Sequence, residues 1–298
     1  GTLRPGRAVR RLGVAAMLAT AAVVPSTSLV AQEQGQPAPG LYEVLQLDDV
    51  IAVLREEGIA GAREIVAGLG STGAGWSATV VRIYDPERMR LVLRQELTQA
   101  MVGQPEATAR AMAFFGSALG VQVLGLETGT RRTLLDPEAE EAAKLRWNDM
   151  VAQGDPRVPL IRRLAEVNDL VEGNVVGTMN SGLWFYRGLA ATGGPFADMT
   201  EDEMLDLARG KEGENRAKAE DWLFPFLALA YVALSEDDLR AYIAYSDTPE
   251  GQVMNTALFA AFNDLFNKIS YDLGRRSGAR WPGRIYRAPQ GPRRCGKA

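Results

Sequence analysis

The side chains with the clearest capacity for chemistry lie four residues apart on one predicted helix. Glu127 precedes Arg131 in the segment GLETGTRR, which is the favourable order for an ion pair on a helix face. A buried pair would be costly to desolvate and would call for a reason such as a polar pocket. Because Glu and Arg are mostly exposed in proteins, we favour a helix rotated so that Glu127, Arg131 and Arg132 lie in water.

Two further polar residues belong to a predicted helix over residues 160–189. Asn168 lies on its otherwise apolar stripe, and we favour an amide that is satisfied by backbone or by a neighbouring helix. The other residue is Glu172. The alternative is that Asn168 and Glu172 join Glu127 and Arg131 in a groove that binds a ligand.

Two absences narrow the reactions that this chain could catalyse. There is no histidine, the side chain most used for acid–base catalysis near neutral pH and the commonest metal ligand. The one cysteine, Cys295, excludes an intrachain disulfide, a cysteine-based zinc site and a Cys–His nucleophile. The sequence also lacks a phosphate-binding glycine loop, a calcium loop and a nucleophile elbow. We therefore predict no metal site and no cofactor.

The elements that must position these residues are organised around two helices and a corner at residues 234–266. Ser235 can cap the first helix. Thr248, Pro249 and Glu250 form a second start signal of cap, first-position proline and acid. Beyond this corner, apolar residues recur at helical spacing and mark a face meant for a core. They are Val253, Met254, Ala257, Leu258, Ala261, Phe262, Leu265, Phe266 and Ile269.

A similar corner occurs earlier in the chain and indicates an internal duplication. FFGSALG at 114–120 aligns with YSDTPEG at 245–251, so that aromatic, hydroxyl and glycine positions coincide. The matched pairs are Phe114 with Tyr245, Ser117 with Thr248, and Gly120 with Gly251. The alternative is that helix corners favour these residue types in any case. In this alignment Glu127 and Arg131 stand where the second copy has apolar residues.

The remaining signals predict an all-α protein, because no alternating strand pattern of useful length appears. Helix start signals recur at Asp85-Pro86, at Asp136-Pro137 and at Thr200 with Glu203. A helix is expected over 41–57 with Gly58 ending it, and Pro225 is expected in the first turns of another helix. We predict a multi-helix bundle over residues 41–274, with two weakly similar helix-corner-helix halves at 41–155 and 156–274.

Both ends of the chain are basic, whereas the body between them is acidic. Residues 1–31 are predicted to be a secretory signal peptide, cleaved near Ala31. This segment has arginines first, then an apolar run at 12–24, and then small residues up to Ala31. In the exported protein, a polar leader at 32–40 would follow the cleavage site. The tail 275–298 has seven Arg, one Lys and no acid. We favour a disordered tail, with contact to anionic lipid or to the acidic body as the alternative. An acidic body argues against nucleic acid as its partner.

The corner sequence also resembles a known family. The phrase LRAYIAYSDTPEGQVMNTALFAAF and its earlier echo AFFGSALGVQVLGLETGTRR are similar to the family called domain of unknown function 2059, best over Ser235–Phe266. IYDPERM, NDLVEGNVVGTMNSGLWFYRGLA and MTEDEML extend the resemblance over most of 41–274, whereas the tail 275–298 departs from it. The resemblance implies an exported, mostly helical, periplasmic protein of Gram-negative bacteria. It implies no activity and carries over no catalytic residue.

Two functions remain open from the sequence. We favour a non-catalytic periplasmic module that binds a partner such as an envelope protein, because the familiar catalytic groups are missing. The alternative is a small-molecule-binding protein or a carboxylate-based enzyme that uses a polar groove around Glu127 and Arg131. A concave pocket lined by these two residues would favour the alternative, and a convex charged surface would favour the module.

Overall fold

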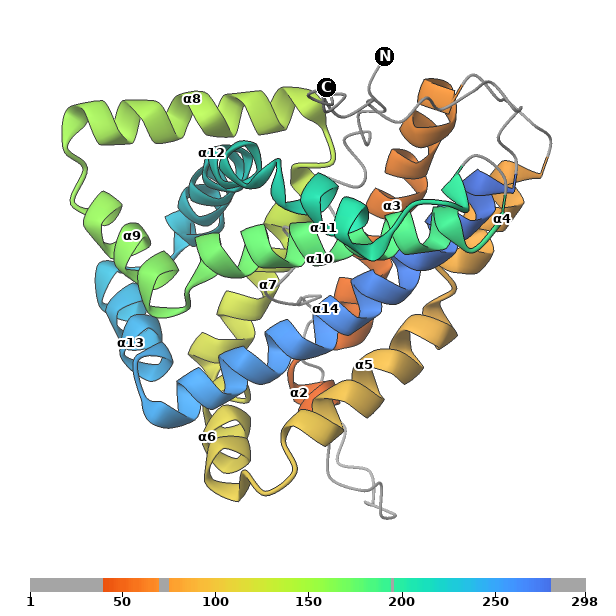
Figure 1. The fold of residues 1–298 in the computed structure, drawn as a ribbon. Helices are drawn as coiled ribbons and strands as arrows, with labels where there is room; N and C mark the ends of the chain where they lie inside the picture. The colour runs from red at the N-terminus through yellow and green to blue at the C-terminus, as the bar shows by residue number, and fades with distance from the viewer. Residues whose placement is uncertain (1–39, 70–74, 194–195, 280–298) are drawn as a thin grey trace, which may run out of the picture.

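The computed structural model describes residues 40–69, 75–193 and 196–279, and within them all regular structure is helical (Figure 1). The helices are α2 (Leu41–Val44), α3 (Leu47–Leu69), α4 (Trp76–Ile83), α5 (Pro86–Ala100), α6 (Pro105–Phe115), α7 (Ala118–Thr133), α8 (Pro137–Gln153), α9 (Arg157–Val167), α10 (Leu170–Ala190), α11 (Glu201–Arg209), α12 (Glu212–Ala230), the 3₁₀ helix η2 (Tyr231–Ala233), α13 (Glu236–Ser246) and α14 (Pro249–Gly278). The predicted all-α, multi-helix bundle is confirmed.

Within the described residues no single helix is long and apolar enough to cross a bilayer, although the bent pair α6 and α7 together reaches the necessary length and composition.

Local capping starts the helices at the predicted positions. The Asp85 carboxylate accepts the backbone N–H of Arg88 at 2.9 Å, and Pro86 takes the first position of α5. Thr200 and Glu203 each accept the backbone N–H of the other at the start of α11. Because each cap joins residues only three apart, the local sequence is enough to predict it.

The first helical segment differs from the prediction, which placed one helix over 41–57. The chain breaks at Gln46, where φ is 52°, and then continues through Gly58 to Leu69 as α3. Gly58 does not end the helix. Instead it admits the ring of Tyr84, which a Cβ at position 58 would meet at 2.1 Å. The glycine therefore serves helix packing rather than helix termination.

Three boundaries in the second half of the chain also differ. The helix predicted over 160–189 is divided into α9 and α10 at Asp169, where φ is 50°. Pro225 lies in the interior of α12 rather than in its first turns. Helix α14 reaches Gly278, so the predicted tail 275–298 begins as helix. The rest of that tail, the predicted signal peptide and nearly all of the predicted leader lie outside the described residues.

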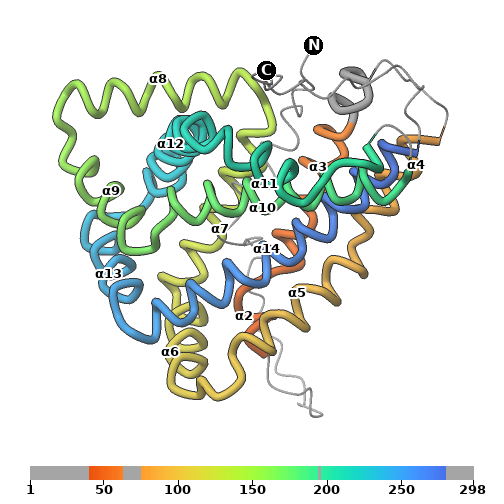
Figure 2. The backbone as a smooth tube through the Cα atoms, viewed as in Figure 1, coloured from red at the N-terminus to blue at the C-terminus, as the bar shows by residue number. Residues whose placement is uncertain are grey.

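The longest helix, α14, crosses the molecule diagonally between α5 and α10 and packs most extensively against α10 (Figure 2). A Cβ at Gly188 of α10 would lie 2.2 Å from the carbonyl oxygen of Tyr271, and one at Gly274 of α14 would lie 2.1 Å from that of Phe185. Because glycine has no side chain, the backbones of the two helices come into contact at these positions.

Both predicted halves contribute to one hydrophobic core. Leu93 and Leu124 from the first half are at most 1% exposed, as are Leu239 and Phe262 from the second. Neither half therefore encloses its apolar faces alone. Polar residues on the inner side of α7 face this shared core rather than solvent.

Candidate functional site

Glu127 lies on α7, inside the shared core. Its side chain is buried, and its oxygen Oε1 accepts hydrogen bonds from the hydroxyls of Tyr231 and Tyr242. The Tyr242 contact is long, at 3.5 Å, and Tyr231 donates the closer one. The other oxygen, Oε2, has no hydrogen-bond partner among the residues that the structure describes. The carboxyl group is therefore enclosed by side chains from η2 and α13, which belong to the other half of the chain.

Enclosure changes the acidity of this group. Burial raises the pKa of Glu127 to about 8, although the hydrogen bonds from Tyr231 and Tyr242 act in the opposite direction. The carboxyl group is therefore mostly protonated at neutral pH, which lets it occupy the core without a cationic partner. Burial also raises the pKa values of both tyrosines well above 10, and the carboxyl group adds to that shift. The acid and both phenols are at most 2% exposed.

Arg131, one turn further along α7, pairs with a different acid from the one predicted. Its Nη2 donates to Oε2 of Glu57 on α3 at 2.8 Å, and its Nε lies 2.8 Å from Oε1 of the same carboxylate. The guanidinium carbon also lies 5.8 Å from the centre of the Trp222 ring. The favoured prediction that Glu127 and Arg131 lie in water is therefore wrong, because both are buried. Only Arg132 is exposed, as predicted.

Asn168 and Glu172 lie in two other environments. The Asn168 side-chain amide donates to the backbone carbonyl of Leu164 at 3.1 Å, and the Asn168 backbone carbonyl accepts from Asn255 at 2.9 Å. The predicted satisfied amide is confirmed. Glu172 lies at the surface of α10 and pairs with Arg216 of α12. The four candidate residues thus have separate partners, and none of them lines either of the two open grooves described below.

The two predicted corners have the same construction and meet each other. At the first corner, the Ser117 hydroxyl donates to the Phe114 carbonyl at 2.6 Å and accepts the Gly120 N–H at 3.1 Å. At the second corner, Thr248 makes the same two bonds, at 2.6 and 3.0 Å. The rings of Phe114 and Tyr245 stack between the corners, 4.2 Å apart and 3° from parallel. The similarity predicted from the sequence therefore extends to the hydrogen bonds.

An open groove lies over this aromatic stack, between α6 and α13, with a volume of about 530 Å³. We call it the corner groove. It is lined by Arg110, Ala113, Phe114, Ser117, Ala241, Ala244, Tyr245 and Thr248. The lining is mostly apolar, and Arg110 has no ion pair with any other residue that the structure describes. This surface can bind an apolar segment, and Tyr245, its one side chain of a type used in general acid–base catalysis, has a buried hydroxyl.

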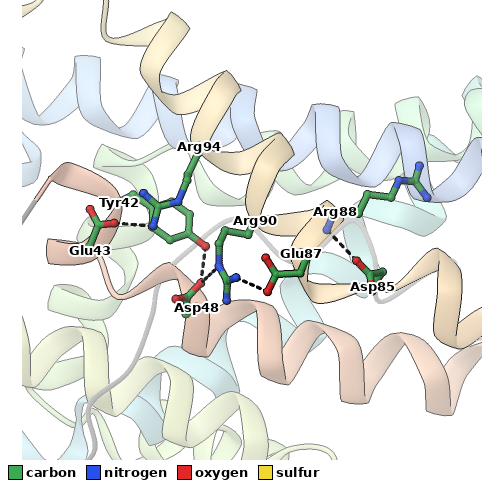
Figure 3. A network of polar contacts seen from close by, with 8 residues as sticks. All are labelled: Tyr42, Glu43, Asp48, Asp85, Glu87, Arg88, Arg90 and Arg94. Carbon is green, nitrogen blue, oxygen red and sulfur yellow. Dashed lines mark hydrogen bonds and ion pairs between the residues drawn. The ribbon is translucent and has the colours of Figure 1, made fainter.

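A polar cluster joins α2, α3 and α5, as Figure 3 shows. Tyr42 donates to an oxygen of Asp48 at 2.8 Å, and Nε of Arg90 donates to the same oxygen at 2.8 Å. Arg94 lies over the Tyr42 ring at 4.0 Å and pairs with Glu43 at 2.5 Å. Partial burial acts to raise the pKa of Asp48, but the hydrogen bonds from Arg90 and Tyr42 outweigh it and hold the pKa below its usual value. The cluster therefore anchors the first helices. Over the described ranges, no group of three acidic side chains is placed to hold a metal ion.

The sequence analysis missed the partners that complete the buried contacts. Glu57 lies 74 residues from Arg131, and Tyr231 lies 104 residues from Glu127. No local spacing signals contacts over such distances. One sign was present in the corner alignment, which puts Glu127 and Arg131 at positions that the second copy fills with apolar residues.

Comparisons with known proteins identify no relative. No protein-family model, no curated protein and no solved structure matches the chain. The resemblance of Ser235–Phe266 to the family called domain of unknown function 2059 therefore stays a prediction, and a function for this chain has to come from its geometry.

Proposed function

We propose that this protein is a non-catalytic, periplasmic interaction module that binds an envelope protein through the corner groove. One observation carries the proposal. The unusual acid and base at Glu127 and Arg131 are enclosed by protein partners, whereas the corner groove is open and apolar. The signal-peptide pattern at 1–31 and the family resemblance support the periplasmic location.

The groove suits an amphipathic helix of the partner. Its walls carry the exposed small side chains of Ala113, Ala241 and Ala244, which let a second helix approach closely. Its floor is the aromatic stack, and aromatic side chains supply much of the affinity at such contacts. Because Arg110 has no acid partner within the described chain, we expect the partner helix to carry a carboxylate beside its apolar stripe.

The test compares two groove variants with a matched control in the full chain. Ala244→Trp fills the corner groove, and Arg110→Glu reverses its charge. Ala142→Trp adds the same bulk at an exposed position of α8 that does not line the groove. A photo-crosslinking group at position 241 identifies the partner helix, and titration with that helix as a purified peptide gives the affinity.

Both groove variants should weaken binding about tenfold or more, whereas Ala142→Trp should bind like the wild type. Reversing the partner's carboxylate to a cation should restore binding to Arg110→Glu. Unchanged affinity in both groove variants would refute the proposal, as would crosslinks only to lipid or to a small molecule.

The alternative, a small-molecule-binding protein or a carboxylate-based enzyme at Glu127 and Arg131, has less support. Both side chains are nearly fully buried and have partners from other helices. Turnover of a compound that is lost in Glu127→Gln, with the fold retained, would favour this alternative instead.

A further inference from the structure

A second open groove lies away from the corners, between α8, α9 and α12, which occupy the upper left of Figure 1. We call it the polar groove, and its lining includes Trp147, Arg162, Glu220 and Phe224. Its volume is about 400 Å³, within the range of sites that hold small ligands. Unlike the corner groove, it presents more polar than apolar surface. It therefore suits a small polar ligand better than an apolar helix.

Two stacked rings form the apolar part of the polar groove. Trp147 of α8 and Phe224 of α12 lie 5.4 Å apart and 9° from parallel. Arg162 of α9 lies over the same indole, with its guanidinium carbon 5.9 Å from the ring centre. The groove thus offers an aromatic contact directly beside a cation.

The wall made by α8 and α9 offers hydrogen-bond donors. Arg162 is exposed and forms no ion pair with the residues that the structure describes, and Asn148 beside it is also exposed. The nearby Lys144 is already engaged, because its Nζ lies 3.2 Å from Glu140 and 3.0 Å from Asp221. A carboxylate is the ligand group that a guanidinium without an acid partner in the described chain and an amide match best.

The wall made by α12 offers acceptors instead. Glu220 is exposed and has no ion pair in the described part of the chain. Pro225 lies inside α12 and has no N–H, so the backbone carbonyl of Asp221 lacks the hydrogen bond that an ordinary helix would supply. A carboxylate and a carbonyl oxygen together match an ammonium group.

We infer that the polar groove binds a short zwitterionic peptide with an aromatic side chain. Its carboxylate binds Arg162 and Asn148. Its ammonium group binds Glu220 and the backbone carbonyl of Asp221, and its ring packs beside Trp147. The donors lie on α8 and α9 and the acceptors on α12, so we choose a ligand whose two charges are separated, a peptide rather than a free amino acid. This site is independent of the corner groove.

The probe is alanyl-phenylalanine, and calorimetric titration of the full chain is the measurement. Two capped forms are ligand controls, because the C-terminal amide lacks the carboxylate and the N-acetyl form lacks the ammonium group. The variants are Arg162→Gln and Glu220→Gln, with Arg146→Gln as a control at an exposed position of α8 outside the groove. All three positions are exposed, so the melting temperature should stay that of the wild type.

The wild type should bind the dipeptide about tenfold more tightly than either capped form. Arg162→Gln should weaken dipeptide binding about tenfold and leave the C-terminal amide unaffected. Glu220→Gln should weaken dipeptide binding to a similar extent and leave the N-acetyl form unaffected, and Arg146→Gln should match the wild type. The proposal is overturned by absent binding, by equal binding of the capped forms, or by an equal loss in Arg146→Gln.

Discussion

Helices α7 and α14 follow equivalent corners, yet they bury different chemistry at matching positions. Leu258 and Phe262 on α14 are 3% and 1% exposed and belong to the apolar core. Glu127 and Arg131, at the aligned positions on α7, are 1% and 3% exposed. These two pairs of aligned positions are therefore buried on both helices, although the residue types differ.

The polar residues are accommodated on α7 in two ways. The guanidinium of Arg131 pairs with the carboxylate of Glu57. Glu127 avoids a charge by keeping its proton, while its Oε1 accepts hydrogen bonds from two tyrosines. Helix α14 needs neither arrangement, because its buried face is mostly apolar. The comparison teaches that distant partners, rather than the helix itself, make a polar inner face possible.

Breaking the ion pair between Arg131 and Glu57 should lower the free energy of unfolding more than any other change considered below. Arg131→Ala leaves the carboxylate of Glu57 nearly buried without its partner, so we expect a loss of about 3–5 kcal/mol in the free energy of unfolding. Denaturant titration measures this loss. Replacing both residues, as Arg131→Met with Glu57→Leu, should recover most of it, because the site would then resemble α14. Equal losses in the single and double variants would contradict this account.

Glu127→Gln should change how the free energy of unfolding depends on pH. The folded state holds the Glu127 proton up to about pH 8, whereas the unfolded chain releases it near the ordinary pKa of 4.5. Between these values the unfolded state binds fewer protons, so stability falls with rising pH by at most about 1.4 kcal/mol per pH unit. The stability of the variant should not fall in this way, because an amide does not titrate. The variant should still fold, since Tyr231 can donate to the amide oxygen. Thermal unfolding across this pH range checks it, and parallel profiles for the two proteins would speak against the raised pKa.

If the corners are equivalent, replacing either corner glycine by alanine should lower the free energy of unfolding by a similar amount. A Cβ at Gly120 would lie 2.0 Å from the carbonyl oxygen of Phe114, and one at Gly251 would lie 2.2 Å from that of Tyr245. Alanine at either position should therefore cost about 1–3 kcal/mol in denaturant unfolding. Gly129→Ala, in open space on α7, is the matched control and should be neutral or stabilising. A loss at only one corner would break the equivalence.

The corner hydroxyls should have the smallest effect. Ser117→Ala and Thr248→Ala each remove one helix cap, and we expect each to lower the free energy of unfolding by about 1 kcal/mol. Ser117→Thr keeps the hydroxyl and should lose much less. Melting temperatures measured side by side test both statements, and a similar loss in the alanine and threonine variants would point to packing rather than capping.

Helix starts and corners were predictable because they depend on neighbours in the chain. The caps at Asp85 and Thr200 join residues three positions apart. The breaks at Gln46 and Asp169 were not predictable, because both residues have φ near +50° although neither is a glycine. Asp adopts this conformation more readily than most residues and Gln does not, and neither residue type by itself marks a helix break.

By itself, the amino-acid sequence determined that this chain is helical, where many helices begin, and that two of its corners are alike. Those features arise from hydrogen bonds within a single turn. Only the tertiary structure decided that Glu127 and Arg131 face inward and receive partners from α3, η2 and α13. The physical reason is that burial depends on how a helix is rotated against its neighbours, and side chains far apart in the chain set that rotation by packing together.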